Sequence, residues 1–337
     1  MSFIKSGNVF TPQGLGAPVF MNDSAIGSGM AFLTGELEKR DPRLLEPLSS
    51  VTWARDIVSK TGGGWSDFTS NYFVDYATSG GAAGGSGIIG GATNDIPVIQ
   101  ANLTKDVWKV FTFSNVLRIP FVDQQKLQSI GRSLDDILDE GIRLNYNKSI
   151  DNVVYEGIPD VGIYGLVNNP NLVATTSPVG AGGSATWKTK TPDEILDDVN
   201  AIINATWEKS EYDLTGMANH ILIPPLQYTY LVGRKISEAG SDSILKFLLE
   251  NNIGKNQGVE LFIAPSRWCT GAGTGGTDRM VAYVNNDKRV NFDLPVPLSR
   301  IMTQPQVTEM AYMTAYAAQL GQVKFLYEQC ARYMDGI

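Results

Sequence analysis

The chain has 337 residues and a formal net charge of -8, with 27 Lys and Arg residues against 35 Asp and Glu residues. This acidic balance argues against a sequence-specific DNA-binding protein, because a negatively charged surface repels phosphate and gains little from counterion release. The 43% hydrophobic content is sufficient for a sizeable core, while 35 Gly and 16 Pro residues favour turns and strands over a helical bundle.

Residues 1–50 are punctuated by glycine and proline and show little hydrophobic periodicity. Such a segment cannot bury much of its own surface, so it predicts either a disordered stretch or an extended arm held by another surface. A short helix is allowed over 31–39. The segment begins without a signal sequence, and the chain has no run of eighteen apolar residues, so no membrane span is expected.

Residues 51–105 predict a β-hairpin with a long tip. Strand-forming residues dominate 66–76, and 96–103 is the expected return strand. The tip between them is glycine-rich, which favours mobility unless another surface pins it. A Gly-x-Gly-x-x-Gly match at 85–90 is rejected as a dinucleotide site, because no helix follows it and no acidic residue stands where a ribose would need one. The glycines singled out at this tip are Gly84, Gly85, Gly87 and Gly90.

A long strand over 105–121 is expected to lead into a long helix over 122–157. Apolar residues recur at three- and four-residue steps through this second segment, which is the pattern of an amphipathic helix. At about 1.5 Å per residue it would span roughly 50 Å. Charged residues are assigned to the opposite face, where a solvated surface or intersubunit charge contacts are favoured over general acid catalysis. These residues are Asp135, Asp136, Asp139, Glu140 and Arg143.

Gly131 and Gly141 lie within the apolar stripe of that helix. Each costs about 1 kcal/mol relative to alanine in a helix interior, so each needs a compensating role. One interpretation, which we favour, is close packing of another backbone against a small residue. The other is a site at which the helix can bend.

Residues 190–295 predict a compact α/β domain. Thr191-Pro-Asp-Glu194 has the composition of a capping box with proline at the first helical position, and helically spaced apolar residues follow it. Strands are expected over 219–223, 258–265 and 278–284, and helices over 226–234 and 243–250. The glycine-rich segment 271–276 lacks the Gly-Lys-Ser/Thr ending of a phosphate loop and predicts a hairpin turn. The tail 298–337 predicts strands that return to the earlier sheet.

The search for catalytic chemistry finds little. The single histidine, His220, has no partner motif and is expected to be structural. No Cys, His and Asp cluster has metal-ligand spacing, so neither a metal nor a cofactor is expected. Cys269 and Cys330 are far apart and predict free buried thiols in a reducing compartment. The sequence therefore favours a protein that is not an enzyme.

The order of these segments resembles that of the major capsid proteins of tailed bacteriophages, which have the HK97-like fold. The local similarities are Gly157-Ile-Pro-Asp-Val-Gly-Ile-Tyr-Gly-Leu-Val-Asn-Asn-Pro170, which resembles a glycine-rich link after the spine helix, and the closing segment 331–337. The resemblance covers nearly the whole chain and rests on architecture more than on tight motifs. It implies an α+β fold whose parts are an N-terminal arm (1–50), an extended loop (51–105), a peripheral domain (106–189 and 296–337) with the spine helix (122–157), and an axial domain (190–295).

The resemblance implies a structural protein that self-assembles as hexamers and pentamers into an icosahedral shell around phage double-stranded DNA, without sequence-specific binding. Portal, scaffold and decoration proteins are further implied partners. The implied location is the virion capsid, assembled in the host bacterial cytoplasm. The chain shows no N-terminal scaffolding segment of the kind some relatives carry, so a separate scaffold or none is expected. Its hairpin tip has no lysine, so no covalent cross-link is expected either.

In such a shell, Gly131 or Gly141 would let the spine helix bend before expansion and straighten during it. Two other protein classes remain open. One is the shell of an encapsulin-type compartment, which shares the fold and loads a protein cargo. The other is a glycine-rich phage tail or surface structural protein.

Overall fold

A computed structural model describes residues 2–6, 9–13, 50–79, 96–129, 134–236 and 242–337. Contacts divide the chain into two units, 1–49 and 50–337. In the first, β1 (Ser2–Ser6) and β2 (Val9–Gln13) form an antiparallel pair that the sequence analysis did not predict. The rest of the predicted arm, the expected helix over 31–39, and Gly84, Gly85, Gly87, Gly90 and Gly131 lie outside the described residues. No helix in the described part is both long and apolar enough to cross a membrane.

The predicted hairpin is present in the second unit. Strands β4 (Phe68–Ser79) and β5 (Val98–Lys109) pair antiparallel without a break in register. The single strand expected over 105–121 is wrong, because residues 105–109 complete β5 and a new strand, β6 (Phe111–Pro120), begins after Val110. The phase of the alternation changes at Val110 and Phe111, two consecutive apolar residues that are both half-buried, and the sequence analysis missed this signal.

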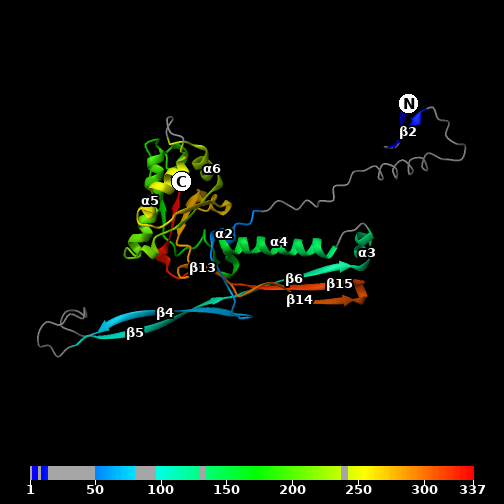
Figure 1. The fold of residues 1–337 in the computed structure, drawn as a ribbon, viewed down its shortest axis with the longest axis horizontal. Coiled ribbons are helices and arrows are strands. Elements are labelled where there is room, and N and C mark those ends of the chain that lie inside the picture. The colour runs from blue at the N-terminus through cyan, green and yellow to red at the C-terminus, as the bar shows by residue number, and fades with distance from the viewer. Residues whose placement is uncertain (1, 7–8, 14–49, 80–95, 130–133, 237–241) are drawn as a thin grey trace. The chain divides into compact units, whose positions relative to one another are not determined.

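Strand β6 forms an antiparallel sheet with β14 (Val296–Gln306) and β15 (Ala311–Leu320), in the order β14-β15-β6. Helix α4 (Leu134–Tyr155) runs along this sheet (Figure 1). Leu117, Ile119 and Tyr316 of the sheet are buried, and Leu138 and Ile142 of α4 pack against them.

The continuous helix predicted over 122–157 is wrong in extent. The segment contains two helices, α3 (Phe121–Ser129) and α4, and residues 130–133 between them lie outside the described part. The 22 residues of α4 span about 33 Å at 1.5 Å per residue, not the roughly 50 Å expected of one helix.

The predicted α/β domain, residues 190–295, contributes three strands to a five-stranded sheet in the order β11-β10-β12-β17-β9, and the last two strands come from outside that range. These strands are β9 (Ala174–Thr176), β10 (His220–Ile223), β11 (Phe262–Pro265), β12 (Arg279–Tyr283) and β17 (Ala331–Asp335). The helices of this region are α5 (Pro192–Lys209), α6 (Pro225–Gly233), α7 (Ile244–Asn251) and α8 (Ile253–Asn256). The capping box is present, since Thr191 Oγ1 accepts from Glu194 N while the Glu194 carboxylate accepts from Thr191 N.

Two predictions about strand pairing are corrected. The segment 271–276 is not a hairpin turn, because β10 lies between β11 and β12 and pairs with both. Strand β17 does not return with the rest of the tail to the earlier sheet, since it pairs with β12 and β9 in the five-stranded sheet. Only 296–320 of the tail joins β6. The β17 sequence, Ala-Arg-Tyr-Met-Asp, does not specify a partner, so its pairing depends on where the preceding chain leaves the strand.

Smaller elements connect these parts. A three-stranded sheet contains β16 (Val323–Phe325), β13 (Val290–Leu294) and β3 (Ser59–Thr61) in that order, and β7 (Gly157–Ile158) pairs with β8 (Ile163–Tyr164). Helix α2 (Trp53–Asp56) precedes β3. Short 3₁₀ helices occur at 159–161, 187–189, 214–216, 267–269, 274–276, 307–309 and 328–330.

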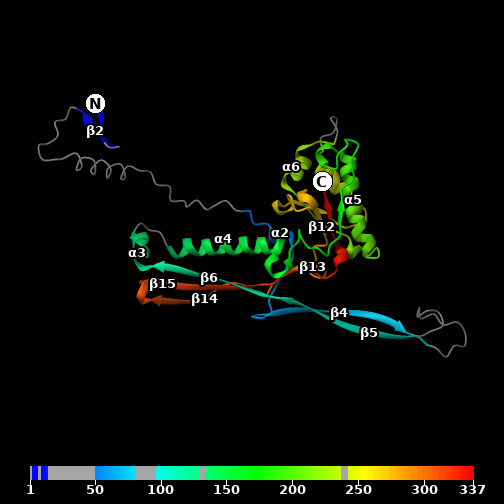
Figure 2. The same ribbon diagram turned by 180° about the vertical axis from the view of Figure 1, so that it is seen from behind.

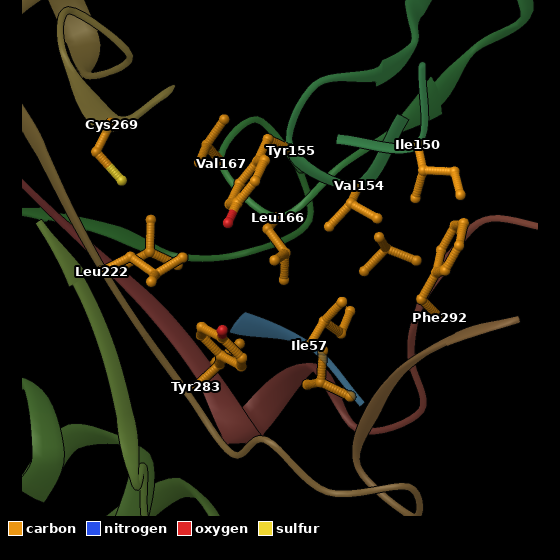
Figure 3. Close-up of a cluster of buried hydrophobic side chains, with 14 of the residues drawn as sticks. Ile57, Ile150, Val154, Tyr155, Leu166, Val167, Leu222, Cys269, Tyr283 and Phe292 are labelled. Carbon is orange, nitrogen blue, oxygen red and sulfur yellow. The ribbon is translucent and has the colours of Figure 1, made fainter. Parts of the chain in front are cut away.

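The C-terminal end of α4 lies in the core where these sheets meet. Ile150, Val154 and Tyr155 are fully buried there (Figure 3). They pack in one cluster with side chains from the five-stranded sheet and from β13, among them Tyr283 and Phe292. Burying three such side chains contributes several kcal/mol at roughly 1.5–3 kcal/mol each. The end of α4 therefore fixes the positions of two sheets.

The glycine-rich link after α4 folds back tightly onto that helix end. Gly157 has φ +76°, and a Cβ on it would lie 2.3 Å from the Ile163 carbonyl oxygen. A Cβ on Gly165 would lie 2.3 Å from the Tyr155 carbonyl group. Only glycine permits both approaches, and they let Leu166, which is fully buried, reach the core beside Tyr155.

Asp151 of α4 connects this core to the start of the second unit. Its side chain is buried, and its Oδ1 accepts hydrogen bonds from the backbone amides of Thr52 (2.8 Å) and Trp53 (3.1 Å) at the N-terminus of α2. Its Oδ2 accepts from Trp268 Nε1 at 2.9 Å. One carboxylate thus satisfies three donors from two distant segments.

Replacing Asp151 with alanine should lower the free energy of unfolding by about 3 kcal/mol, because three donors lose their acceptor and each bond is worth about 1 kcal/mol. Chemical denaturation of the unassembled protein measures this. Asp160→Ala, at an exposed position in the 3₁₀ helix 159–161, is the control and should change stability little. Equal stability of the two variants would contradict the bridging role of Asp151.

Candidate assembly surfaces

One face of the β4–β5 hairpin is apolar and exposed. The register places alternate residues of both strands on the same side, for example Val74 opposite Leu103 and Tyr72 opposite Lys105. The large apolar side chains on this side are each 48% to 72% exposed. We call this the apolar face of the hairpin, and it consists of Phe68, Tyr72, Val74, Tyr76, Ile99, Leu103 and Val107.

The opposite face of the hairpin anchors it to the rest of the second unit. Lys324 Nζ lies 4.7 Å from the centroid of the Trp108 ring, and the Phe73 ring meets the Tyr327 ring edge-on at 5.9 Å. Next to β4, the Gln319 side chain accepts from Ser66 N and donates to Ser66 O, both at 3.0 Å. The sequence analysis missed these anchors, because each joins residues more than 200 positions apart. Anchoring through one face leaves the apolar face open.

The charged residues of the spine helix do not share one solvated face, as the sequence analysis expected. Asp139 accepts a hydrogen bond from the Tyr316 hydroxyl of β15 at 2.5 Å and from Arg143 Nε at 2.8 Å. Asp135 lies 3.6 Å from Arg300 of β14. Positions 135, 139 and 142 fall on one helical stripe, so both carboxylates share the side on which Ile142 packs against the sheet. The predicted opposite face is wrong for Asp135 and Asp139.

Gly141 is exposed in α4, and a Cβ built on it would meet no atom within 4 Å. The favoured interpretation of close packing is therefore wrong for Gly141 within this chain. Gly131 lies outside the described residues, so the same interpretation stays a prediction there.

The Tyr316 hydroxyl, followed by Arg143, holds the pKa of the Asp139 carboxyl below its usual value of 3.8. Both groups stabilise the carboxylate relative to the protonated acid. Since the folded-state pKa is the lower one, the contact stabilises the fold above the unfolded pKa and is lost as pH falls through the folded value.

His220 is buried among aromatic rings. Its ring centroid lies 4.7 Å from that of Phe262 and 5.1 Å from that of Tyr283, and its Nε2 is 3.6 Å from Asp56 Oδ1. Burial alone would raise the pKa of Asp56, but contacts from His220, Arg55 and Tyr155 bring it below its usual value. These contacts fit the structural role predicted for His220.

The two cysteines are free and buried, as predicted. Burial raises the pKa of Cys269 to about 12, so its thiolate is scarce at neutral pH. Across the described residues, no group of three or more His, Cys, Asp or Glu side chains is arranged to hold a metal ion.

A family model described as "Major capsid protein" matches residues 84–337. The chain belongs to the major capsid protein family. No curated protein matches the sequence. The family assignment confirms the resemblance on which the sequence analysis relied.

Solved structures show that this capsid protein has the HK97-like fold. The capsid of Myoviridae phage XM1 matches with a TM-score of 0.72 at 18% identity, covering 90% of this chain and 98% of that one. A structure of Microbacterium phage Oxtober96 matches with a TM-score of 0.58 at 11% identity, covering 90% and 97%. The holo-SrpI encapsulin of Synechococcus elongatus PCC 7942 matches with a TM-score of 0.50 at 11% identity, covering 91% and 95%.

In this capsid protein, Tyr316→Phe should make stability less sensitive to acid. Without the hydroxyl, the folded-state pKa of Asp139 moves up toward its unfolded value, so less stability is lost as pH falls below about 4. Denaturant midpoints of the unassembled protein at pH 7, 5, 4 and 3 measure the effect. Tyr312→Phe, on the same strand and 40% exposed, is the control. A Tyr316→Phe curve parallel to wild type would contradict the role of the hydroxyl.

Proposed function

We propose that this capsid protein assembles with copies of itself, as hexamers and pentamers, into a closed icosahedral shell that encloses double-stranded DNA. The apolar face of the hairpin carries the proposal. Leu103 and Tyr76 are each 72% exposed, and the other members of the face are at least 48% exposed. A contiguous apolar surface of this kind marks an interaction site in a soluble protein.

A second copy of the chain is the occupant best suited to this face. A two-stranded hairpin is marginally stable in water by itself, and β4 and β5 have no third strand among the described residues. The contacts of Trp108 and Phe73 anchor the hairpin through the face opposite the apolar face. When a surface of one copy contacts a different surface of the next copy, repeating the contact around an axis forms a closed ring. Hexamers and pentamers are such rings.

The net negative charge of the chain supports a shell that encloses DNA without binding it tightly. A net charge of -8 offers little counterion release on contact with phosphate. We therefore propose no sequence-specific DNA binding. Because the family is that of major capsid proteins, we also propose a structural rather than an enzymatic role. The proposed location is the virion capsid, assembled in the host bacterial cytoplasm, with portal, scaffold and decoration proteins as further partners.

A shell that loads a protein cargo is the second candidate, and the similarity to the SrpI encapsulin supports it. The phage XM1 capsid supports the first candidate more strongly, since its TM-score is 0.72 against 0.50. The nucleic acid content of shells purified from the native source distinguishes the two. Packaged double-stranded DNA supports the phage capsid, and a co-purifying protein cargo without DNA supports the compartment.

Leu103→Asp should prevent assembly, because a carboxylate at the centre of the apolar face would be buried against the neighbouring copy. The unassembled protein should keep its melting temperature, because residue 103 is exposed within the single chain. Electron microscopy and light scattering measure the assembled fraction. Gln100→Asp places the same charge on the other face of the same strand, opposite Ala77, and should still assemble. Assembly of Leu103→Asp at wild-type yield would refute the role of the apolar face.

Replacing both Gly131 and Gly141 with alanine should favour the expanded form of the shell. At position 141 the alanine methyl group enters open space. The substitution stabilises the helical conformation by about 1 kcal/mol. A spine helix that bends at these positions would lose this stabilisation, while a straight spine helix would keep it. Shell diameters from electron microscopy, before and after the expansion trigger, test this. An unchanged ratio of compact to expanded shells would refute a bending role for these glycines.

A further inference from the structure

The five-stranded-sheet region has a cavity of about 610 Å³ beside α6. Trp187, Leu226 and Tyr230 form much of its apolar lining. This volume is within the range of sites that accept a ligand or a large side chain. Leu226 is 77% exposed at its edge, so the cavity opens to the surface. We call it the α6 cavity.

The wall of the α6 cavity contains a polar side chain, Gln227, with one hydrogen-bonding atom that has no partner among the described residues. Gln227 is 8% exposed, and its Nε2 donates to Asp278 Oδ2 at 2.6 Å and to the Ile337 carbonyl oxygen at 3.3 Å. Both partners are acceptors, which fixes the orientation of the amide. Its Oε1 has no hydrogen-bond partner among the described residues. This oxygen is enclosed by protein atoms, so it costs the wall about 1–3 kcal/mol without offering an accessible contact in the cavity.

The rim of the α6 cavity is basic. Lys188 and Arg234 belong to its lining, and exposed Lys235 follows directly. The Arg234 guanidinium lies 5.4 Å from the centroid of the Tyr230 ring, which holds it at the rim. The carboxylate of the lining, Asp278, already accepts from Gln227 and from Gly271 N. The cavity therefore offers cationic groups around an apolar floor.

Another side of the same region carries the complementary charge. The exposed face of α5 presents Asp193, Asp197 and Glu208, and Glu211 follows the helix, so carboxylates outnumber the exposed Lys209 at its end. In both views α5 and α6 lie on different sides of this region (Figures 1 and 2). A surface and its complement on different sides of one molecule allow a head-to-tail contact between copies.

The turn after α5 presents an aromatic side chain among these carboxylates. Glu211 and Tyr212 have φ values of +56° and +61°, a conformation that non-glycine residues adopt at a cost. Tyr212 is 59% exposed, and its ring rests against Trp207 at 5.2 Å. Asp213 already pairs with Arg289 at 3.1 Å, so Glu211 is the free carboxylate of this turn within the described part.

We propose that the turn 211–213 of one copy enters the α6 cavity of the next copy around a capsomer ring. Glu211 pairs with Arg234 and Lys188 at the rim, and the Tyr212 ring covers the apolar floor. Tyrosine and arginine in desolvated pockets are frequent anchors of protein interfaces. The inference rests on the proposed self-assembly and identifies one contact that joins neighbouring copies.

Charge exchange between Glu211 and Arg234 tests the contact. Each single variant, Arg234→Glu and Glu211→Arg, should lower the assembled fraction at least tenfold at low salt, because like charges then meet. The double variant should recover at least half of the wild-type fraction. Light scattering and electron microscopy give the fraction, and circular dichroism checks that each variant is folded. Both positions are exposed, so folding should be unaffected.

Two matched reversals serve as controls on the same region. Lys255→Glu and Glu260→Lys change exposed charges away from the cavity and should assemble as wild type does. Wild-type assembly by the single cavity variants, or failure of the double variant to recover, overturns the contact and leaves the proposed function standing. A wild-type protein that never assembles overturns the proposed function itself.

A cross-link gives an independent readout. The double variant Leu214→Cys and Thr229→Cys keeps Tyr212 and places one thiol directly after the turn, at a position 44% exposed, and one in the cavity lining, while the native cysteines stay buried. Under mild oxidation of assembled particles, a ladder of disulfide-linked oligomers supports the contact. Particles that remain monomeric on non-reducing gels overturn it.

Discussion

The second unit depends on the burial of one helix end. Tyr155, Val154 and Ile150 of α4 are fully buried among side chains from the five-stranded sheet and β13. The rest of α4 runs along the β14-β15-β6 sheet with Leu138 and Ile142 toward it. One helix therefore belongs to two packed groups at once. Because interiors are close-packed, a shift at one end is transmitted along the helix to the other group.

Buried polar contacts complete this junction. Asp151 receives three donors from α2 and from the region of Trp268, while Asp56 receives the Tyr155 hydroxyl and the Arg55 guanidinium. Apolar packing gives cohesion, and these directional bonds select one arrangement of the segments. The glycines at 157 and 165 permit the chain to leave the helix end without disturbing it.

The surfaces that suit assembly are those which the single chain leaves incomplete. The hairpin is anchored through Trp108 and Phe73, so its apolar face is available to another molecule. The α6 cavity has a basic rim and an unpaired amide oxygen in its wall. An exposed apolar surface like that of the hairpin is typical of an interaction site in a soluble protein.

By itself, the sequence determined the local elements and the family. The hairpin, the capping box at Thr191, the helices after it and strand β10 all follow from periodicity and turn chemistry, which act over a few residues. Segment order then sufficed for the resemblance that the family model bears out. Only the tertiary structure decided which distant segments pair or pack with one another. It placed β17 beside β12 and turned Asp139 toward Tyr316. Those outcomes depend on contacts between residues far apart in the chain, and a sequence pattern of period two or 3.6 contains no information about which distant segment will pack against it.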